Sequence, residues 1–157
     1  MKDRNKKLLL SAIFAIIALI HPQLSWSQCS TYYVIESEQI SPSLMRLSII
    51  VYGKEKKTID ADAMKTALNV ALFDGIPRTL FQKPLLDDGF NTSIEKYPAY
   101  FSDFYNYRYR DFIQSCIRTS KFKKADKNNG TQYDIEIKIM NLRKDLEKNQ
   151  IRKKLGI

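Results

Sequence analysis

Residues 133–139 read Tyr-Asp-Ile-Glu-Ile-Lys-Ile and form the clearest structural pattern in the chain. Apolar side chains occupy every second position, and Asp134, Glu136 and Lys138 stand between them. Because successive side chains of a β-strand point to opposite faces, this period of two predicts a strand with one buried face. The other face is expected to be polar and solvated, so helices should cover only one side of the sheet.

Two more strands are predicted upstream, at residues 31–38 (TYYVIESE) and 44–52 (LMRLSIIVY). Both segments are rich in β-branched and aromatic residues, which favour strands. Ser41-Pro42-Ser43 lies between them and is typical of a turn. The two strands are therefore expected to pair as a hairpin.

Three helices are expected around these strands. The first is predicted to have Asp60 as its N-cap and to end just before Gly75. The second begins at Pro98 and runs to about Ile117, and a short third helix is capped by Asn141. The fold class is therefore α+β: a small, mostly antiparallel sheet of about three strands in the order β-β-α-α-β-α, with helices packed on one face.

Two stretches between these elements lack a periodic pattern. Residues 76–96 contain several turn-forming residues and are expected to form a long loop. Loops of that length are uncommon in compact domains, so part of the segment should be a short helix or a functional segment. Residues 121–130 (KFKKADKNNG) are predicted to be a basic, polar linker.

The N-terminal segment predicts export. Residues 1–7 are mainly basic, residues 8–20 are apolar apart from one serine, and residues 25–27 (SWS) place small residues around Trp26. These three features together indicate a secretory signal peptide that is cleaved after Ser27. The apolar run spans only about 20 Å as a helix, which is short of the ~30 Å core of a bilayer.

Cleavage defines the expected organisation: residues 1–27 are the signal peptide, and residues 28–157 are one α+β domain with a basic C-terminal segment. The mature protein is expected to be periplasmic or secreted. It would associate with a membrane only if the signal were retained or if Cys29 were lipidated. Trp26 and Gln28 stand where a lipidation motif normally has a leucine and a small residue.

Cleavage also changes the charge and the available chemistry. The full chain carries 26 Lys and Arg against 17 Asp and Glu, a net charge of +9, and its only histidine is His21. Without His21, the mature chain has no Ser-His or Cys-His catalysis and no histidine-ligated zinc. The remaining charge of +6 lies entirely within residues 121–157. No cofactor or metal site is predicted.

Cys29 and Cys116 both remain after cleavage. An exported chain meets an oxidising environment, so a disulfide between them is expected. The alternatives are a buried Cys116 with Cys29 free or lipidated. The chain has no Cys-x-x-Cys spacing, which argues against a redox-active pair.

Neighbouring carboxylates are the remaining catalytic candidates. Asp87 with Asp88, or Asp60 with Asp62, could supply the acid and base of a glycan hydrolase. Acidic residues in a turn or at the start of a helix more often serve solvation and capping.

The aromatic run at residues 97–109 is the densest unusual feature of the chain. Tyr and Arg are enriched at protein interfaces, so the exposed side of this helix is a candidate binding surface. Its candidate residues are Tyr107, Arg110, Tyr100 and Arg108. The alternative is that most of the run packs the helix against the sheet.

The basic C-terminal segment is compatible with an acidic partner or an anionic envelope surface. Export argues against nucleic acid as a partner.

The junction Ser25-Trp26-Ser27-Gln28, followed by an α+β domain, resembles small exported proteins of Gram-negative bacterial envelopes. The element order is also similar to accessory domains of envelope lipoproteins, from which the chain departs in lacking a good lipidation motif. This resemblance implies a domain that binds partners and does not catalyse. The leading hypothesis is a non-catalytic, exported binding domain for an unknown protein or envelope component. The alternatives are a histidine-free carboxylate hydrolase acting on envelope or extracellular glycans, and a self-associating structural envelope subunit.

Overall fold

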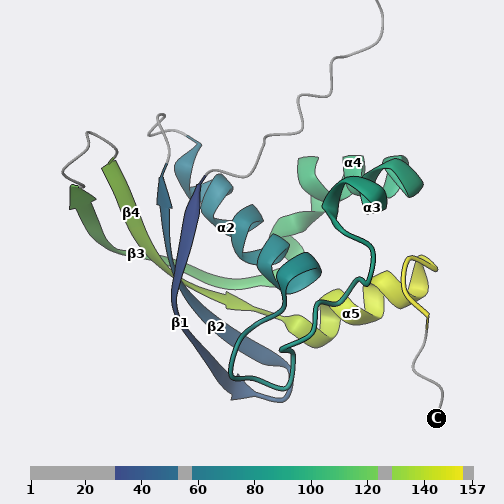
Figure 1. The fold of residues 1–157 in the computed structure, drawn as a ribbon, viewed down its shortest axis with the longest axis horizontal. Helices are drawn as coiled ribbons and strands as arrows, with labels where there is room; N and C mark the ends of the chain where they lie inside the picture. Colours follow the sequence, from purple (N-terminus) through teal and green to yellow (C-terminus); the bar gives the residue numbers. More distant parts are fainter. Residues whose placement is uncertain (1–30, 53–57, 124–128, 154–157) are drawn as a thin grey trace, which may run out of the picture.

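The computed structural model describes residues 31–52, 58–123 and 129–153, which form a four-stranded antiparallel sheet with helices on one face (Figure 1). The sheet has the order β1-β2-β4-β3 and is built from β1 (Tyr32–Ser41), β2 (Leu44–Tyr52), β3 (Ile113–Lys123) and β4 (Asn129–Ile137). The α-helices are α2 (Ile59–Asn69), α3 (Phe90–Lys96), α4 (Pro98–Asn106) and α5 (Ile139–Lys148). The expected α+β fold class is confirmed.

The two central strands carry the core face of the sheet. Met45, Leu47 and Ile49 of β2 are fully buried, and they pair with Ile137, Ile135 and Tyr133 of β4. The alternation in the sequence therefore predicts the buried face correctly. Full burial of each aliphatic side chain contributes about 1.5–3 kcal/mol. Helix α2 packs on this face against β2, β4 and β3.

The prediction of a helix reaching Ile117 is wrong. Helix α4 ends at Asn106, a 3₁₀ turn η2 (Arg108–Phe112) follows, and strand β3 begins at Ile113. The predicted linker is also partly wrong, because residues 121–123 extend β3 and residues 129–130 begin β4, while residues 124–128 lie outside the described ranges. Strand β4 is central and its backbone hydrogen-bonding groups need partners on both sides, so β3 is recruited to its second edge.

Two predicted helix caps are also wrong. Thr58 is the N-cap of α2, and Asp60 lies in the first turn of that helix. Lys138 is the N-cap of α5, and Asn141 lies inside that helix. Neither N-cap makes a side-chain hydrogen bond to the helix, so these helices start without the capping interaction that the sequence suggested.

The prediction for Gly75 is correct. A π-helical turn η1 (Val70–Asp74) extends α2, and Gly75 follows it with φ = 82°. A Cβ atom at this position would lie 2.0 Å from the carbonyl oxygen of Gln82. Both the left-handed backbone and the close approach therefore require glycine here.

The segment between η1 and α4 contains the short helix that its length suggested, namely α3. The amides of Leu85 and Leu86 donate to the carbonyl oxygens of Ala71 and Leu72 at 3.1 and 2.9 Å. These hydrogen bonds fold the loop back onto the end of the α2–η1 helix. The loop is thereby fixed in place by backbone contacts.

Much of the aromatic run packs in the core. Phe101, Phe104, Tyr109 and Phe112 are buried, and Phe104 stacks on Phe112 with ring centroids 5.6 Å apart. The buried hydroxyl of Tyr105 also forms a hydrogen bond within the core, to the Asn69 side chain. The aromatic residues of α4 and η2 therefore pack these two segments against α2.

Candidate interaction surface

The face of the sheet opposite the helices is open to solvent (Figure 1). We call it the open sheet face, and its side chains alternate with those of the core. It includes Tyr33, Glu36, Glu38, Arg46, Ser48, Ile50, Gln132, Asp134, Glu136, Ser115 and Ile117, with Ile35 at a bulge of β1. All four strands therefore contribute to one surface.

A network of polar side chains organises the centre of the open sheet face. Arg46 donates to Glu136 at 2.9 Å and to Glu38 at 3.1 Å, so one guanidinium links three strands. Ser48 donates to Asp134 at 2.7 Å. The hydrogen bond from Arg46 lowers the pKa of the Glu136 carboxyl, and the Ser115 hydroxyl adds to this effect. The Glu136 carboxylate therefore stays charged at neutral pH.

The open sheet face is acidic. Its described strand residues include the carboxylates Glu36, Glu38, Asp134 and Glu136, and one guanidinium, that of Arg46. This charge contrasts with the net charge of +9 of the whole chain. A charged surface of sign opposite to the rest of the molecule favours an oriented approach of a partner.

Exposed apolar side chains flank the acidic centre on both edge strands. Tyr33 is 63% exposed and Ile35 45% exposed on β1, and Ile117 is 58% exposed on β3. Tyr33 pairs with Ile50 and Ile117 pairs with Asp134, so both point to the open side of the sheet. Apolar side chains gathered on an otherwise charged surface are typical of interaction sites.

A loop tip that is hydrogen-bonded to β1 adds a further apolar side chain beside this strand. The Ser37 hydroxyl donates to the carbonyl oxygen of Pro77 at 2.5 Å, and the amide of Leu80 donates to the Gln39 side chain at 3.3 Å. These contacts hold the tip against the helix-facing side of β1, and Leu80 remains 82% exposed. The outer edge of β1 is thus bordered by apolar groups on both sides.

The structure divides the four binding residues predicted from the aromatic run into two pairs. Tyr107 is 75% exposed and Arg110 is exposed, with its Nε donating to the Tyr109 hydroxyl at 3.0 Å. Tyr100 and Arg108, by contrast, both bind the carboxylate of Asp145 on α5. Only Tyr107 and Arg110 therefore present their polar ends to solvent.

Asp145 gives Tyr100 and Arg108 a bracing role. The Tyr100 hydroxyl donates to it at 2.8 Å, and the Arg108 guanidinium lies 5.7 Å from the Tyr100 ring centroid. Burial raises the pKa of Tyr100, and its hydrogen bond to Asp145 raises it further. The three side chains tie α4 and η2 to α5.

Cys116 lies on β3, where it pairs with Ile135 on the core face and is half-buried. Burial raises the pKa of its thiol to about 11, so the thiol is protonated at neutral pH. It forms no disulfide with any other residue that the structure describes. Cys29 lies outside the described ranges, so the predicted Cys29–Cys116 bond stays a prediction.

The candidate carboxylates fall into two separate arrangements. Asp60 accepts hydrogen bonds from Tyr133 and Arg118, both at 2.6 Å, and these hydrogen bonds lower its pKa. It therefore joins α2 to the sheet. Asp87 and Asp88 line a cleft of about 480 Å³, in which Asp88 forms an ion pair with Lys96 at 3.2 Å.

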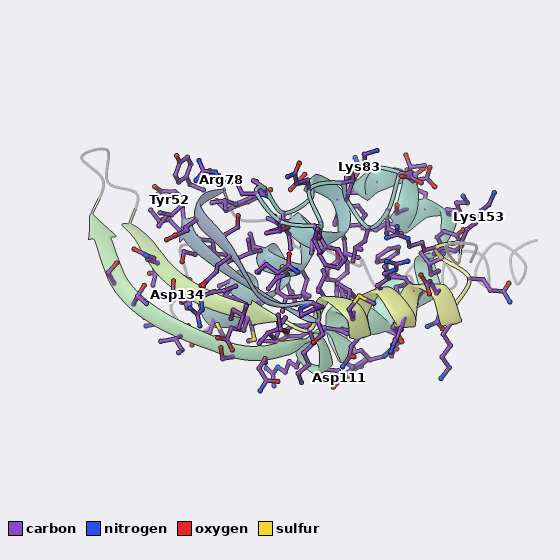
Figure 2. All side chains as sticks on the ribbon, turned by 90° about the horizontal axis from the view of Figure 1, so that it is seen from below. Tyr52, Arg78, Lys83, Asp111, Asp134 and Lys153 are labelled. Carbon is purple, nitrogen blue, oxygen red and sulfur yellow. The ribbon has the colours of Figure 1, made fainter. Side chains whose placement is uncertain are left out.

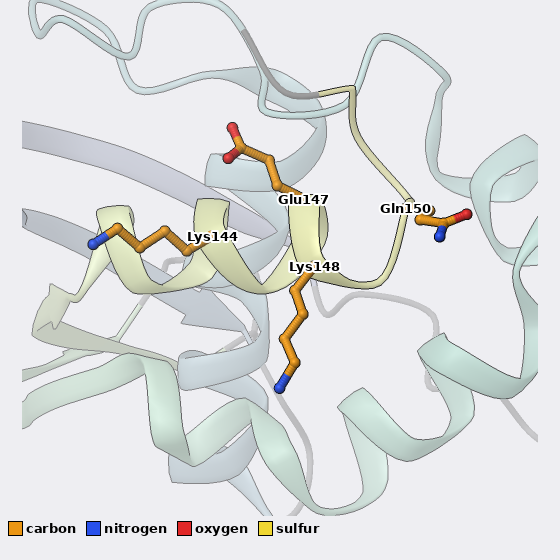
Figure 3. Close-up of a pocket in the computed structure, with 4 residues that line it drawn as sticks. All are labelled: Lys144, Glu147, Lys148 and Gln150. Atoms are coloured by element: carbon orange, nitrogen blue, oxygen red, sulfur yellow. The ribbon is translucent and has the colours of Figure 1, made fainter.

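A second hollow lies along α5 and is shown in Figure 3. Its side chains Lys144, Lys148, Glu147 and Gln150 point in different directions, and Glu147 is paired with Arg143 at 2.9 Å. They do not converge on a common point where a ligand could bind. In the described ranges, no cluster of three or more His, Cys, Asp or Glu side chains could hold a metal ion.

The chain matches no protein-family model, no curated protein and no solved structure. None of the helices within residues 31–52, 58–123 and 129–153 has the length and apolar character needed to cross a membrane.

The open sheet face includes residues that the sequence analysis did not single out. Tyr32, Tyr33, Val34 and Ile35 are four apolar or aromatic residues in succession at the start of β1. Consecutive apolar residues on a strand must place apolar side chains on both faces of the sheet. That signal was sufficient to expect an exposed apolar group on the face away from the helices.

Proposed function

We propose that the protein is an exported, non-catalytic binding domain that recognises a protein or another envelope component through its open sheet face. Export rests on the signal-peptide pattern of residues 1–27. The observation that carries the binding role is the uncovered sheet face, on which exposed Tyr33, Ile35 and Ile117 flank an ordered network of charges.

The apolar part of this surface supplies a driving force for association. Burial of apolar area contributes about 25 cal/mol per Å², so covering three large exposed side chains contributes several kcal/mol. The polar part supplies specificity, because the Arg46 guanidinium is already held between Glu38 and Glu136. A surface that is ordered before binding loses less entropy on association.

The charge of the surface favours a partner that differs from this chain. Two copies that met through their open sheet faces would bring the carboxylates of Glu36, Asp134 and Glu136 close to like charges. Such juxtaposition is destabilising. A partner with basic and apolar side chains is therefore a better complement than a second copy.

Two other candidate sites are less well supported. The Tyr107–Arg110 surface is smaller than the sequence suggested, because Tyr100 and Arg108 are engaged by Asp145. A carboxylate hydrolase would need one carboxyl as acid and another as base. In the cleft, Lys96 is paired with Asp88, which leaves Asp87 as the unpaired carboxylate among the described lining residues.

The experiment compares three forms of the exported chain, residues 28–157, in pull-downs from envelope extract: wild type, Tyr33→Ser with Ile117→Ser, and Tyr107→Ser with Arg110→Ser. Circular dichroism establishes that all three are folded. The proposal expects a specific partner to be lost from the first double variant and retained by the second. If the partner were lost from the second double variant alone, the binding site would be the Tyr107–Arg110 surface and the proposal would be wrong.

A further inference from the structure

The cleft of about 480 Å³ lies away from the open sheet face. Figure 2 shows Asp134 of the open sheet face and Lys153 of the cleft at opposite ends of the molecule. The walls come from three places: the loop segment 85–88, helix α3 with Tyr97, and the segment 150–153 that follows α5. Its volume is in the range of sites that bind small molecules.

The inner part of the cleft is apolar and fixed. Leu85 and Leu86 are 4% and 5% exposed, and their amides donate to carbonyl oxygens of η1. Ser93 is also buried, and its hydroxyl donates to the carbonyl oxygen of Asp88 at 3.1 Å. Ile151 also lines the cleft and packs against the core. The cleft is therefore preformed, and Leu85, Leu86 and Ile151 give it an aliphatic part.

The charged side chains around the cleft have a net positive charge. Lys96 and Asp88 neutralise each other as an ion pair at 3.2 Å. Arg152 and Lys153 have no ion-pair partner among the described residues, and Asp87 also has none. Arg152 is half-buried and lines the cleft. The cleft thus offers an excess of positive charge beside an apolar lining.

The backbone that carries Arg152 is fixed by the C-terminal cap of α5. Gln150 has φ = 58°, which is a left-handed conformation that favours glycine. The amides of Ile151 and Arg152 then both donate to the carbonyl oxygen of Leu146, at 2.9 and 3.3 Å. This left-handed residue with its amide-to-carbonyl hydrogen bonds is a common way for an α-helix to end, and it fixes the backbone course of Ile151 and Arg152.

We propose that this cleft binds a small organic anion: a carboxylate or phosphate group attached to an apolar body. The planar guanidinium of Arg152 suits either acidic group through paired hydrogen bonds, and Lys153 adds a second positive charge. The apolar body would rest on Leu85, Leu86 and Ile151. Asp87 faces the same cleft and weakens the binding of an anion through repulsion.

The test uses four probes and isothermal titration calorimetry on the exported chain, residues 28–157. The probes are octyl phosphate, octanoate, inorganic phosphate and octylammonium. Loss of a charge-assisted hydrogen bond weakens binding by about tenfold or more. We therefore expect Arg152→Gln to weaken octyl phosphate or octanoate binding by about this factor. The stronger of these two binders identifies the acidic group.

Two further variants sharpen the test. Lys144→Gln removes a positive charge from α5 outside the cleft, and it should leave affinity within about twofold because surface charges act weakly at a distance. Asp87→Asn should tighten anion binding by about two- to threefold through the loss of a repulsion. The two substitutions are at exposed positions, so the variants should fold like the wild type.

Four results would overturn the proposal. The first is octylammonium binding as tightly as the two anionic amphiphiles. The second is equal affinity of Arg152→Gln and wild type for both anionic amphiphiles, and the third is weaker binding by Asp87→Asn. Inorganic phosphate that bound as tightly as octyl phosphate would equally overturn the role of the apolar lining.

Discussion

Replacement of Asp145 by alanine tests whether Tyr100 and Arg108 act as a brace of the fold. Asp145 has a side chain that is only 17% exposed, and it accepts hydrogen bonds from both residues. Asp145→Ala leaves the Tyr100 hydroxyl and the Arg108 guanidinium without this acceptor. The substitution changes no backbone contact, so the loss reports on the side-chain network.

The size of the effect follows from burial. A hydrogen bond to a charged group contributes about 1.5–3 kcal/mol, and that of Tyr100 falls in this range because the side chain is half-buried. Arg108 is 29% exposed and retains Asp103 at 3.5 Å, so its loss is smaller, about 1 kcal/mol. Alanine regains about 0.5 kcal/mol of helix propensity in α5. The net loss is about 2–3.5 kcal/mol.

Urea unfolding gives the free energy directly. The proposed mature chain, residues 28–157, lacks the sole tryptophan, Trp26, so tyrosine fluorescence or far-UV circular dichroism serves as the signal. For a domain of this size, the expected loss corresponds to a decrease in Tm of about 10 °C. A double-mutant cycle with Tyr100→Phe isolates the Tyr100–Asp145 contribution.

The control is Asp103→Ala, which removes a carboxylate that is 51% exposed and should cost less than about 0.5 kcal/mol. A loss below about 0.5 kcal/mol for Asp145→Ala would refute the bracing role. Tyr100 and Arg108 would then return to the list of candidate binding residues.

Three further predictions concern the sheet, the loop and export. The lowered pKa of Asp60 stabilises the fold above the ordinary carboxyl pKa of about 4, and this contribution is lost as the pH falls through the lower folded value. The difference in unfolding free energy between wild type and Asp60→Asn should therefore shrink on acidification, and a pH-independent difference would contradict this assignment. Gly75→Ala should destabilise the domain by more than about 1 kcal/mol in thermal unfolding, because alanine tolerates neither the positive φ nor the nearby carbonyl; an unchanged Tm would contradict it. The intact mass of the exported protein should correspond to cleavage after Ser27 with a Cys29–Cys116 disulfide, and a mass that retains residues 1–27 or carries a lipid would contradict the predicted processing.

The sequence predicts the centre of the fold but not its edge. Strands β2 and β4 keep an unbroken alternation, so their buried faces can be recognised from the sequence alone. Strand β3 has bulges between Ile113 and Ser115 and between Arg118 and Ser120. Each bulge adds a residue and shifts the alternation, which removes the pattern that identifies a strand. The preceding aromatic run has helical spacing, so the sequence predicts a helix that continues beyond its actual end at Asn106.

The candidate binding residues show a similar limit. Tyr107 was expected to be exposed because a helix can bury only one side of the aromatic run, and it is exposed. The role of Tyr100 depends on Asp145, which lies 45 residues further along the chain. Nothing in the local sequence indicates that contact. The open sheet face depends in the same way on which side the helices cover, and that is decided by packing.

Site-specific photo-crosslinking in the producing cell tests the central claim, that the open sheet face is the binding surface. A photoreactive phenylalanine analogue replaces Tyr33 in one form of the full chain and Tyr107 in another. Both side chains are exposed aromatic residues, so the two forms are matched. The proposed function predicts a defined crosslinked product from position 33 and none from position 107. A product from position 107 alone would contradict it.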